Sequence, residues 1–191
     1  METPDVTVPN HTPIATAPRD IDAIKAQEKD CTLPFWNGNV AFKLGVNLRT
    51  RLLTEERPAV VHISTISTPP HVLFHAQTPH LQVTHPGTSS DNDVWVSRKR
   101  AAVIRFAAST WRLQNQYGGD EEAFKAKLGL GQETAGQYAI HGGGVPVFIK
   151  GCDGMVAVVV VSGLKQWDDH QVVVEEMGRL KEEMERAGGV V

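Results

Sequence analysis

Residues 141–170 read HGGGVPVFIKGCDGMVAVVVVSGLKQWDDH, and this stretch decides the fold. A glycine-rich turn leads into two apolar segments, residues 145–149 and 155–161, whose short polar connection is typical of a β-hairpin. Ser162 and Gly163 then lead to an acidic helix start that includes His170. Because small and polar residues stand at both ends of an apolar hairpin, we expect a binding site beside it.

The rest of the chain predicts helices on both sides of an antiparallel sheet. A second hairpin is predicted from the alternating, β-branched patterns of residues 59–66 and 71–76. Helical spacing marks residues 19–30, 39–56, 91–117, 123–128 and a last helix that carries Val173, Met177 and Leu180 on one stripe. Residues 77–90 and 131–136 have loop composition, and residues 137–140 are expected to be extended. The fold class is therefore a single-domain α/β protein.

Composition limits the function classes. The chain has 191 residues and is 41% hydrophobic, which suits one core, and its formal charge of −3 argues against nucleic-acid binding. Its two cysteines lack zinc-ligand spacing, which favours a reducing compartment. Residues 1–18 contain four prolines and no Lys or Arg, so we expect a disordered tail before a domain over residues 19–191. The longest apolar run, residues 155–161, is too short to span a bilayer, and we expect a cytoplasmic protein that binds neither membrane nor nucleic acid.

One face of the predicted helix 91–117 contains a lysine among mostly apolar residues. Trp95, Lys99, Ala102, Phe106 and Ser109 follow one another at spacings of four, three, four and three. Lys99 has two interpretations: its ammonium reaches solvent or an acidic side chain, or it points into a pocket and binds an anion. In the second interpretation Trp95 and Phe106 form an apolar wall.

The glycine turn and the second mouth of the hairpin complete the candidate site. Unhindered amides at Gly142 and Gly143, beside His141, suit an anionic ligand such as a phosphate, a carboxylate or the propionates of haem. The same turn resembles an esterase oxyanion loop, but no G-x-S-x-G motif accompanies it. Ser162 with His170 is compatible either with helix capping or with a catalytic pair.

Histidines are concentrated between residues 71 and 85, at positions 71, 75, 80 and 85. His71 and His75 project to the same side of a strand, which could begin a metal or haem-iron site. Because no cysteine or carboxylate stands at ligand spacing beside them, we predict no metal site.

Three motifs in combination resemble the haem-degrading-domain family. They are DNDVWVSRKRAAVIRFAAST from Asp91, HGGGVP from His141 and VSGLKQWDDHQVVVE from Val161, and the resemblance covers residues 21–180. Within the family the chain is most similar to a branch of short cytosolic proteins related to the GlcG and HbpS haem-binding proteins. The resemblance implies a profilin-like antiparallel sheet flanked by helices, homo-oligomers built from dimers, and haem or iron among the ligands. It implies no catalytic set.

Three functional hypotheses follow. The first is an oligomeric protein that binds haem or another small anionic ligand through ten residues. These are Trp95, Lys99, Phe106, Ser109, His141, Gly142, Gly143, Ser162, Gly163 and His170. The alternative is a non-enzymatic adaptor in a chaperone or protein-targeting pathway, and the third is a redox or hydrolytic enzyme that uses Cys152 or Ser162.

Overall fold

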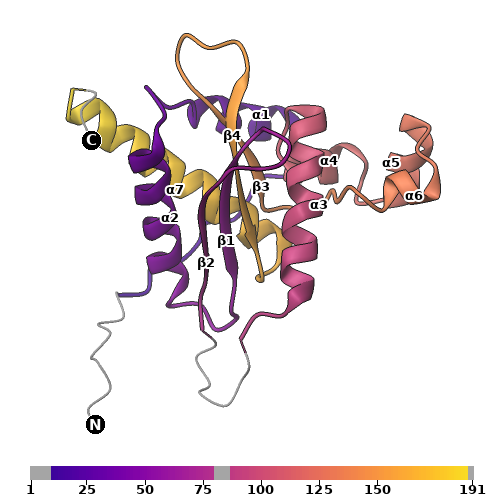
Figure 1. Cartoon of the computed structure of the whole chain (residues 1–191), viewed down its shortest axis with the longest axis horizontal. Coiled ribbons are helices and arrows are strands. Elements are labelled where there is room, and N and C mark those ends of the chain that lie inside the picture. Colours follow the sequence, from indigo (N-terminus) through magenta and orange to yellow (C-terminus); the bar gives the residue numbers. More distant parts are fainter. Residues whose placement is uncertain (1–9, 80–86, 189–191) are drawn as a thin grey trace.

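The computed structural model describes residues 10–79 and 87–188, which form a mixed α/β domain around one antiparallel sheet (Figure 1). The strands are β1 (Val60–Thr65), β2 (Val72–Gln77), β3 (Gly144–Phe148) and β4 (Met155–Ser162), in the spatial order β2-β1-β4-β3. All three neighbouring pairs are antiparallel. The predicted fold class is confirmed, and both predicted hairpins are present.

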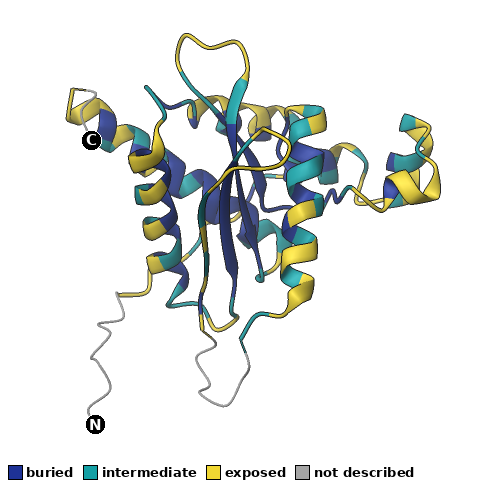
Figure 2. Ribbon diagram, viewed as in Figure 1, coloured by how far each residue is buried: buried dark blue, intermediate teal, exposed yellow. Residues whose placement is uncertain are grey.

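Helices cover both faces of the sheet, which explains why β4 is apolar without alternation. Val61, Val159 and Val161 face α2 (Gly38–Leu52) and α7 (Gln166–Arg186) in the main core cluster. Val158 and Val160 face α3 (Ser90–Phe106) in a second cluster. A strand buried on both faces is expected to be a continuous apolar run. Figure 1 shows α2 and α3 on opposite sides of the sheet, and in Figure 2 the buried residues concentrate on the strands.

The predicted long helix over residues 91–117 is wrong, because the chain breaks after α3. Ala107 adopts a left-handed conformation (φ 48°), and α4 (Thr110–Gln116) begins in a new direction. The break is fixed by Ser109, whose hydroxyl accepts a hydrogen bond from the Arg112 amide at 3.0 Å. The amide of Ser109 in turn donates to the buried carboxylate of Glu28 on α1 (Ile21–Asp30) at 2.7 Å. A serine at an N-cap position is the sequence signal for this second start.

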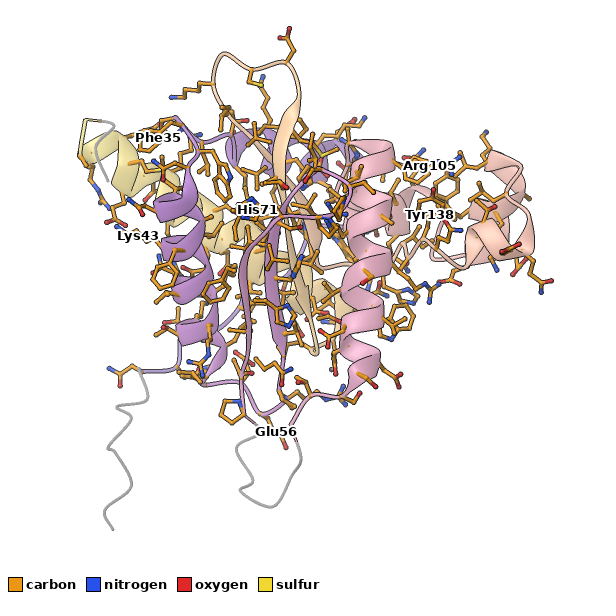
Figure 3. All side chains as sticks on the ribbon, in the orientation of Figure 1. Phe35, Lys43, Glu56, His71, Arg105 and Tyr138 are labelled. Atoms are coloured by element: carbon orange, nitrogen blue, oxygen red, sulfur yellow. The ribbon has the colours of Figure 1, made fainter. Side chains whose placement is uncertain are left out.

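The region after α4 also differs in detail from the prediction. Two short helices, α5 (Glu121–Leu128) and α6 (Gln132–Ala135), project from the body beyond α3 (Figure 1). The first was expected, whereas α6 lies in the segment predicted to be a loop, and residues 137–140 form no strand. Arg105 and Tyr138, labelled in Figure 3, connect this projection to α3 through a 2.9 Å hydrogen bond to the tyrosine hydroxyl.

The segment before α1 is only partly as expected. Residues 1–9 of the predicted disordered tail lie outside the described residues. Further along, the Ala15 amide donates to Glu175 at 2.9 Å, and the Trp111 indole donates to the Pro18 carbonyl at 2.6 Å. Ala17 is buried. Residues 13–18 therefore pack on the domain, where the sequence predicted disorder.

None of the helices described here is long and apolar enough to cross a membrane.

The Ser109 cap should have a measurable effect on stability. Replacing Ser109 with Ala removes the side-chain acceptor for the Arg112 amide, and we expect a loss of about 1 kcal/mol in the free energy of unfolding. Urea denaturation followed by circular dichroism measures this loss. Ser97→Ala serves as the control, because Ser97 is exposed on α3; equal stability of S109A and wild type would contradict the capping role.

Candidate functional site

A cavity of about 410 Å³ opens at the end of the sheet where β4 leads into α7. Its walls come from the first half of α3, the residue that precedes the glycine turn, and the β4–α7 connection. The lining residues are Asn92, Trp95, Lys99, His141, Ser162, Gly163, Leu164, Lys165, Gln166, Trp167 and Asp169. The volume lies within the range of small-ligand pockets.

A buried ion pair forms the base of this cavity. The Lys99 ammonium lies 3.0 Å from the Asp169 carboxylate and donates at 3.0 Å to the Val161 carbonyl, and both charged side chains are 4% exposed. The other Asp169 oxygen accepts from the Leu164 amide at 3.0 Å. Burial raises the pKa of Asp169, and the Lys99 charge opposes that shift. Of the two interpretations of Lys99, the structure shows the acidic partner, so this ammonium is not free to neutralise a ligand.

The glycine turn is shaped by close packing. A Cβ atom on Gly142 would lie 2.2 Å from the Gln166 carbonyl oxygen, and one on Gly143 (φ 120°) would lie 2.3 Å from the Val161 oxygen and 2.8 Å from the Lys99 nitrogen. Glycine is required where backbones approach so closely. The Gly142 amide donates to the Gln166 side chain at 3.3 Å. The turn therefore lets α3, β4 and α7 meet, and this donor already has a protein acceptor.

His141 presents an imidazole to the cavity. Its ring packs edge-on against Trp95 with 5.0 Å between centroids. Its Nδ1 lies 3.4 Å from Glu121 on α5, yet this buried atom makes no hydrogen bond to the described residues. Burial lowers the pKa of His141. The negative charge of Glu121 partly opposes this shift, and the positive charges of Lys99 and Arg98 add to it. The ring is therefore neutral at pH 7, which is the form that can bind a metal centre.

Two cavity residues that the sequence analysis did not select stand at the beginning of α7. Lys165 is exposed, and its ammonium lies 5.5 Å from the centroid of the Trp167 ring. Lys165 occupies the N-cap position without a side-chain cap, so the first turn of α7 keeps amides that no side chain satisfies in this way. The absence of Ser, Thr, Asp or Asn at this cap was the available signal.

The structure places only some of the ten predicted site residues at the cavity. Trp95, Lys99, His141, Ser162 and Gly163 line the cavity. Gly142 and Gly143 lie directly behind it, in contact with Gln166 and Lys99.

Phe106, Ser109 and His170 lie elsewhere. Phe106 packs with Phe124 and Tyr138 in a separate apolar cluster, and Ser109 caps α4. His170 is fully buried and stacked on Trp111 at 6.1 Å, and neither of its ring nitrogens has a partner among the described residues. His170 therefore makes no hydrogen bond to the Ser162 turn, and neither the capping interpretation nor the catalytic pair is correct for these two residues.

The candidate histidines and cysteines lie only partly among the described residues. His80 and His85 lie outside the described residues. Within residues 10–79 and 87–188, no three His, Cys, Asp or Glu side chains gather as metal ligands. Cys31 is buried and donates to the Val174 carbonyl at 3.4 Å, and burial raises the pKa of its thiol to about 12. Cys152 is exposed in the β3–β4 turn.

The fold and cavity define an α/β domain whose antiparallel sheet ends in a ligand-sized pocket. The chain belongs to the family of haem degrading proteins that are HbpS-like, which matches residues 37–177. A UPF0303 protein of Mesorhizobium japonicum is 35% identical over 83% of this chain and 86% of its own length. A UPF0303 protein of Streptomyces avermitilis is also 35% identical, over 85% of this chain and 91% of its own length.

Solved structures agree on the fold. The crystal structure of the Ybr137w protein has a TM-score of 0.75 and 28% identity over 86% of this chain and 88% of its own. HbpS has a TM-score of 0.55 with 18% identity, covering 76% and 89% of the two chains. A PduOC–haem complex has a TM-score of 0.50 with 16% identity, covering 78% and 94%.

The Lys99–Asp169 pair should stabilise the domain strongly. Lys99→Met leaves a buried carboxylate without its partner, and we expect a loss of about 3–5 kcal/mol in the free energy of unfolding. Lys150→Met removes an exposed pair with Glu185 and should cost far less, because water screens an exposed ion pair. Chemical denaturation of both variants measures the two losses in unfolding free energy. Losses of equal size would show that the buried Lys99–Asp169 pair stabilises the domain no more than an exposed pair does.

His170 should make stability fall in acid. Its pKa is about 3 in the folded protein because burial disfavours the charged ring, against an ordinary value of 6.5. The unfolded chain therefore binds a proton first, and stability present above pH 6.5 is lost as the pH falls toward the folded pKa. Between pH 6 and 4, His170→Phe should lower the slope of stability against pH by about 1.4 kcal/mol per pH unit.

The control for this slope is His71→Ala, since His71 is exposed before β2. Urea denaturation at several pH values gives the slopes. An identical pH dependence for H170F and wild type would show that His170 becomes protonated in the native state.

Proposed function

We propose that the cavity binds haem or another flat anionic ligand of similar size. The observation that carries this proposal is the neutral imidazole of His141 in the same cavity as the side chains of Trp95 and Trp167. Aromatic walls with a few convergent polar groups are typical of cofactor pockets. The structure thus combines an apolar surface with a group able to bind a metal centre.

The cavity residues suit haem in three respects. His141 lines the cavity and is half-buried with a lowered pKa, so its neutral imidazole would bind the iron of haem. Trp95 and Trp167 would contact the macrocycle. Lys165 and the first amides of α7 would hold a propionate, because a helix N-terminus favours negative charge. Bound haem would supply an iron centre, and these residues would bind and orient it.

Relatives support haem among the anionic ligands. The matching family is described as haem degrading, and one structural neighbour is a haem complex. Lys99 is paired with Asp169, so in this proposal Lys165 replaces it as the positive charge that meets the anionic ligand.

Haem titration of tag-free protein tests this function. We expect a saturable shift of the Soret band in wild type, a shift of altered position in His141→Ala because the axial nitrogen is lost, and about tenfold weaker binding in Lys165→Glu, equivalent to about 1.4 kcal/mol. His71→Ala and Lys127→Glu are the matched controls, since both residues are exposed outside the cavity lining. No saturable shift in wild type, or spectra of H141A and H71A that are identical to that of wild type, would overturn the proposal.

Self-association into homo-oligomers built from dimers is also part of the proposal, and the outer face of α2 supports it. Phe42 is 60% exposed and Val46 39% exposed, one turn apart on this helix. Adjacent exposed apolar side chains are typical of interaction surfaces, and they also favour the adaptor alternative.

A further inference from the structure

Two histidines from neighbouring strands meet at the side of α3. His62 on β1 and His75 on β2 are directly opposite in the strand register, and their Nδ1 atoms are 3.1 Å apart. Their rings are inclined at 73°. The sequence placed His75 beside His71 within one strand, whereas the structure pairs it with a residue thirteen positions earlier. Neither histidine lines the cavity described above.

The pair has one fixed and one accessible member. His62 is buried under α3, whereas the side chain of His75 is 37% exposed on the edge strand. The Nε2 atom of His75 lies 3.5 Å from the carboxylate of Asp93 on α3. A carboxylate on the outer nitrogen of a histidine is the arrangement that orients metal-binding imidazoles and raises their basicity.

The charges around the pair favour neutral imidazole at His62. Burial, followed by the charges of His75 and Arg100, lowers the pKa of His62 to about 4. Arg100 on α3 is bound to the Ser64 hydroxyl at 2.8 Å and to the carbonyl of Thr65. Its positive charge opposes a bound cation, and the Asp93 carboxylate on the other side offsets it. The ring of His62 is therefore neutral at pH 7. One of the two Nδ1 atoms donates its proton to the other, and a metal ion bound between them would replace this proton.

We propose that His62 and His75 form a two-imidazole site for one divalent transition-metal ion of the Ni²⁺ and Cu²⁺ class, with Asp93 positioning His75. Metal–nitrogen bonds of about 2.1 Å and a nitrogen separation of 3.1 Å give an angle close to 90° at the metal. That angle suits the square-planar and tetragonal geometries of these ions better than the tetrahedral geometry of Zn²⁺. Rotation of the rings about the Cβ–Cγ bonds, where the torsional preference is broad, would aim both Nδ1 atoms at the ion. Water would complete the coordination on the exposed side.

Isothermal titration of tag-free protein with NiCl₂ tests the site. We expect one equivalent of binding in wild type that is absent in His75→Ala, and affinity about tenfold weaker in Asp93→Asn because His75 loses its outer partner. Matched controls are His71→Ala, an exposed neighbour outside β2, and Asp91→Asn, which removes the same charge from the same turn of α3.

A second readout keeps the test independent of small changes in folding. Ni²⁺ that binds only the folded protein should raise the thermal unfolding midpoint of wild type but not of H75A. Paramagnetic Ni²⁺ should also broaden the ring proton signals of His62 and His75 before those of the other histidines. Equal Ni²⁺ binding by wild type and H75A, or loss of binding in H71A, would overturn the proposal. Soret titration of H75A should match wild type, so failure here and failure of the cavity proposal are distinguishable.

Discussion

The buried pair of Lys99 and Asp169 is the interaction on which the arrangement of the site depends. It joins α3 to the first turn of α7, and its ammonium also binds the carbonyl of Val161 at the end of β4. Isolated charges are strongly disfavoured in a protein interior, so each partner requires the other in place. Gly143 is required at the same point because any side chain there would collide with the lysine and with β4. The floor of the cavity is thus set by electrostatics and close packing together.

Most of the fold was predictable because the spacing of apolar residues along the sequence determines which faces of helices and strands are buried. The two hairpins, α2 and the apolar stripe of α7 follow from alternation or from a spacing of three and four. The break at Ala107 was not predictable from this period, since the apolar pattern of residues 91–117 continues through it. What decides the break is a tertiary contact, the bond from the Ser109 amide to Glu28 on α1. Tertiary interactions of this kind override helix propensity.

The site was predictable in location and less so in roles. Trp95, His141 and Ser162 meet because the glycine turn and the β4–α7 connection stand at one end of the hairpin, as the quoted stretch indicates. The sequence could not show which carboxylate would pair with Lys99, because Asp168 and Asp169 are adjacent and only the helix direction separates them. Asp169 points inward and is buried, whereas Asp168 is partly exposed. Because Lys99 is neutralised by Asp169, the proposed function assigns the cationic role to Lys165 at the start of α7.

Burial acts on three histidines in the same direction but with different chemical consequences. The pKa of His170 falls to about 3, that of His62 to about 4, and that of His141 is also lowered. All three rings are neutral at pH 7, yet only two can meet a ligand. His170 is enclosed by Trp111 and the core, whereas His141 opens to the cavity and His62 adjoins the accessible ring of His75. Neutral imidazole is the form that binds metal ions, so access decides which of these three rings can act as a ligand.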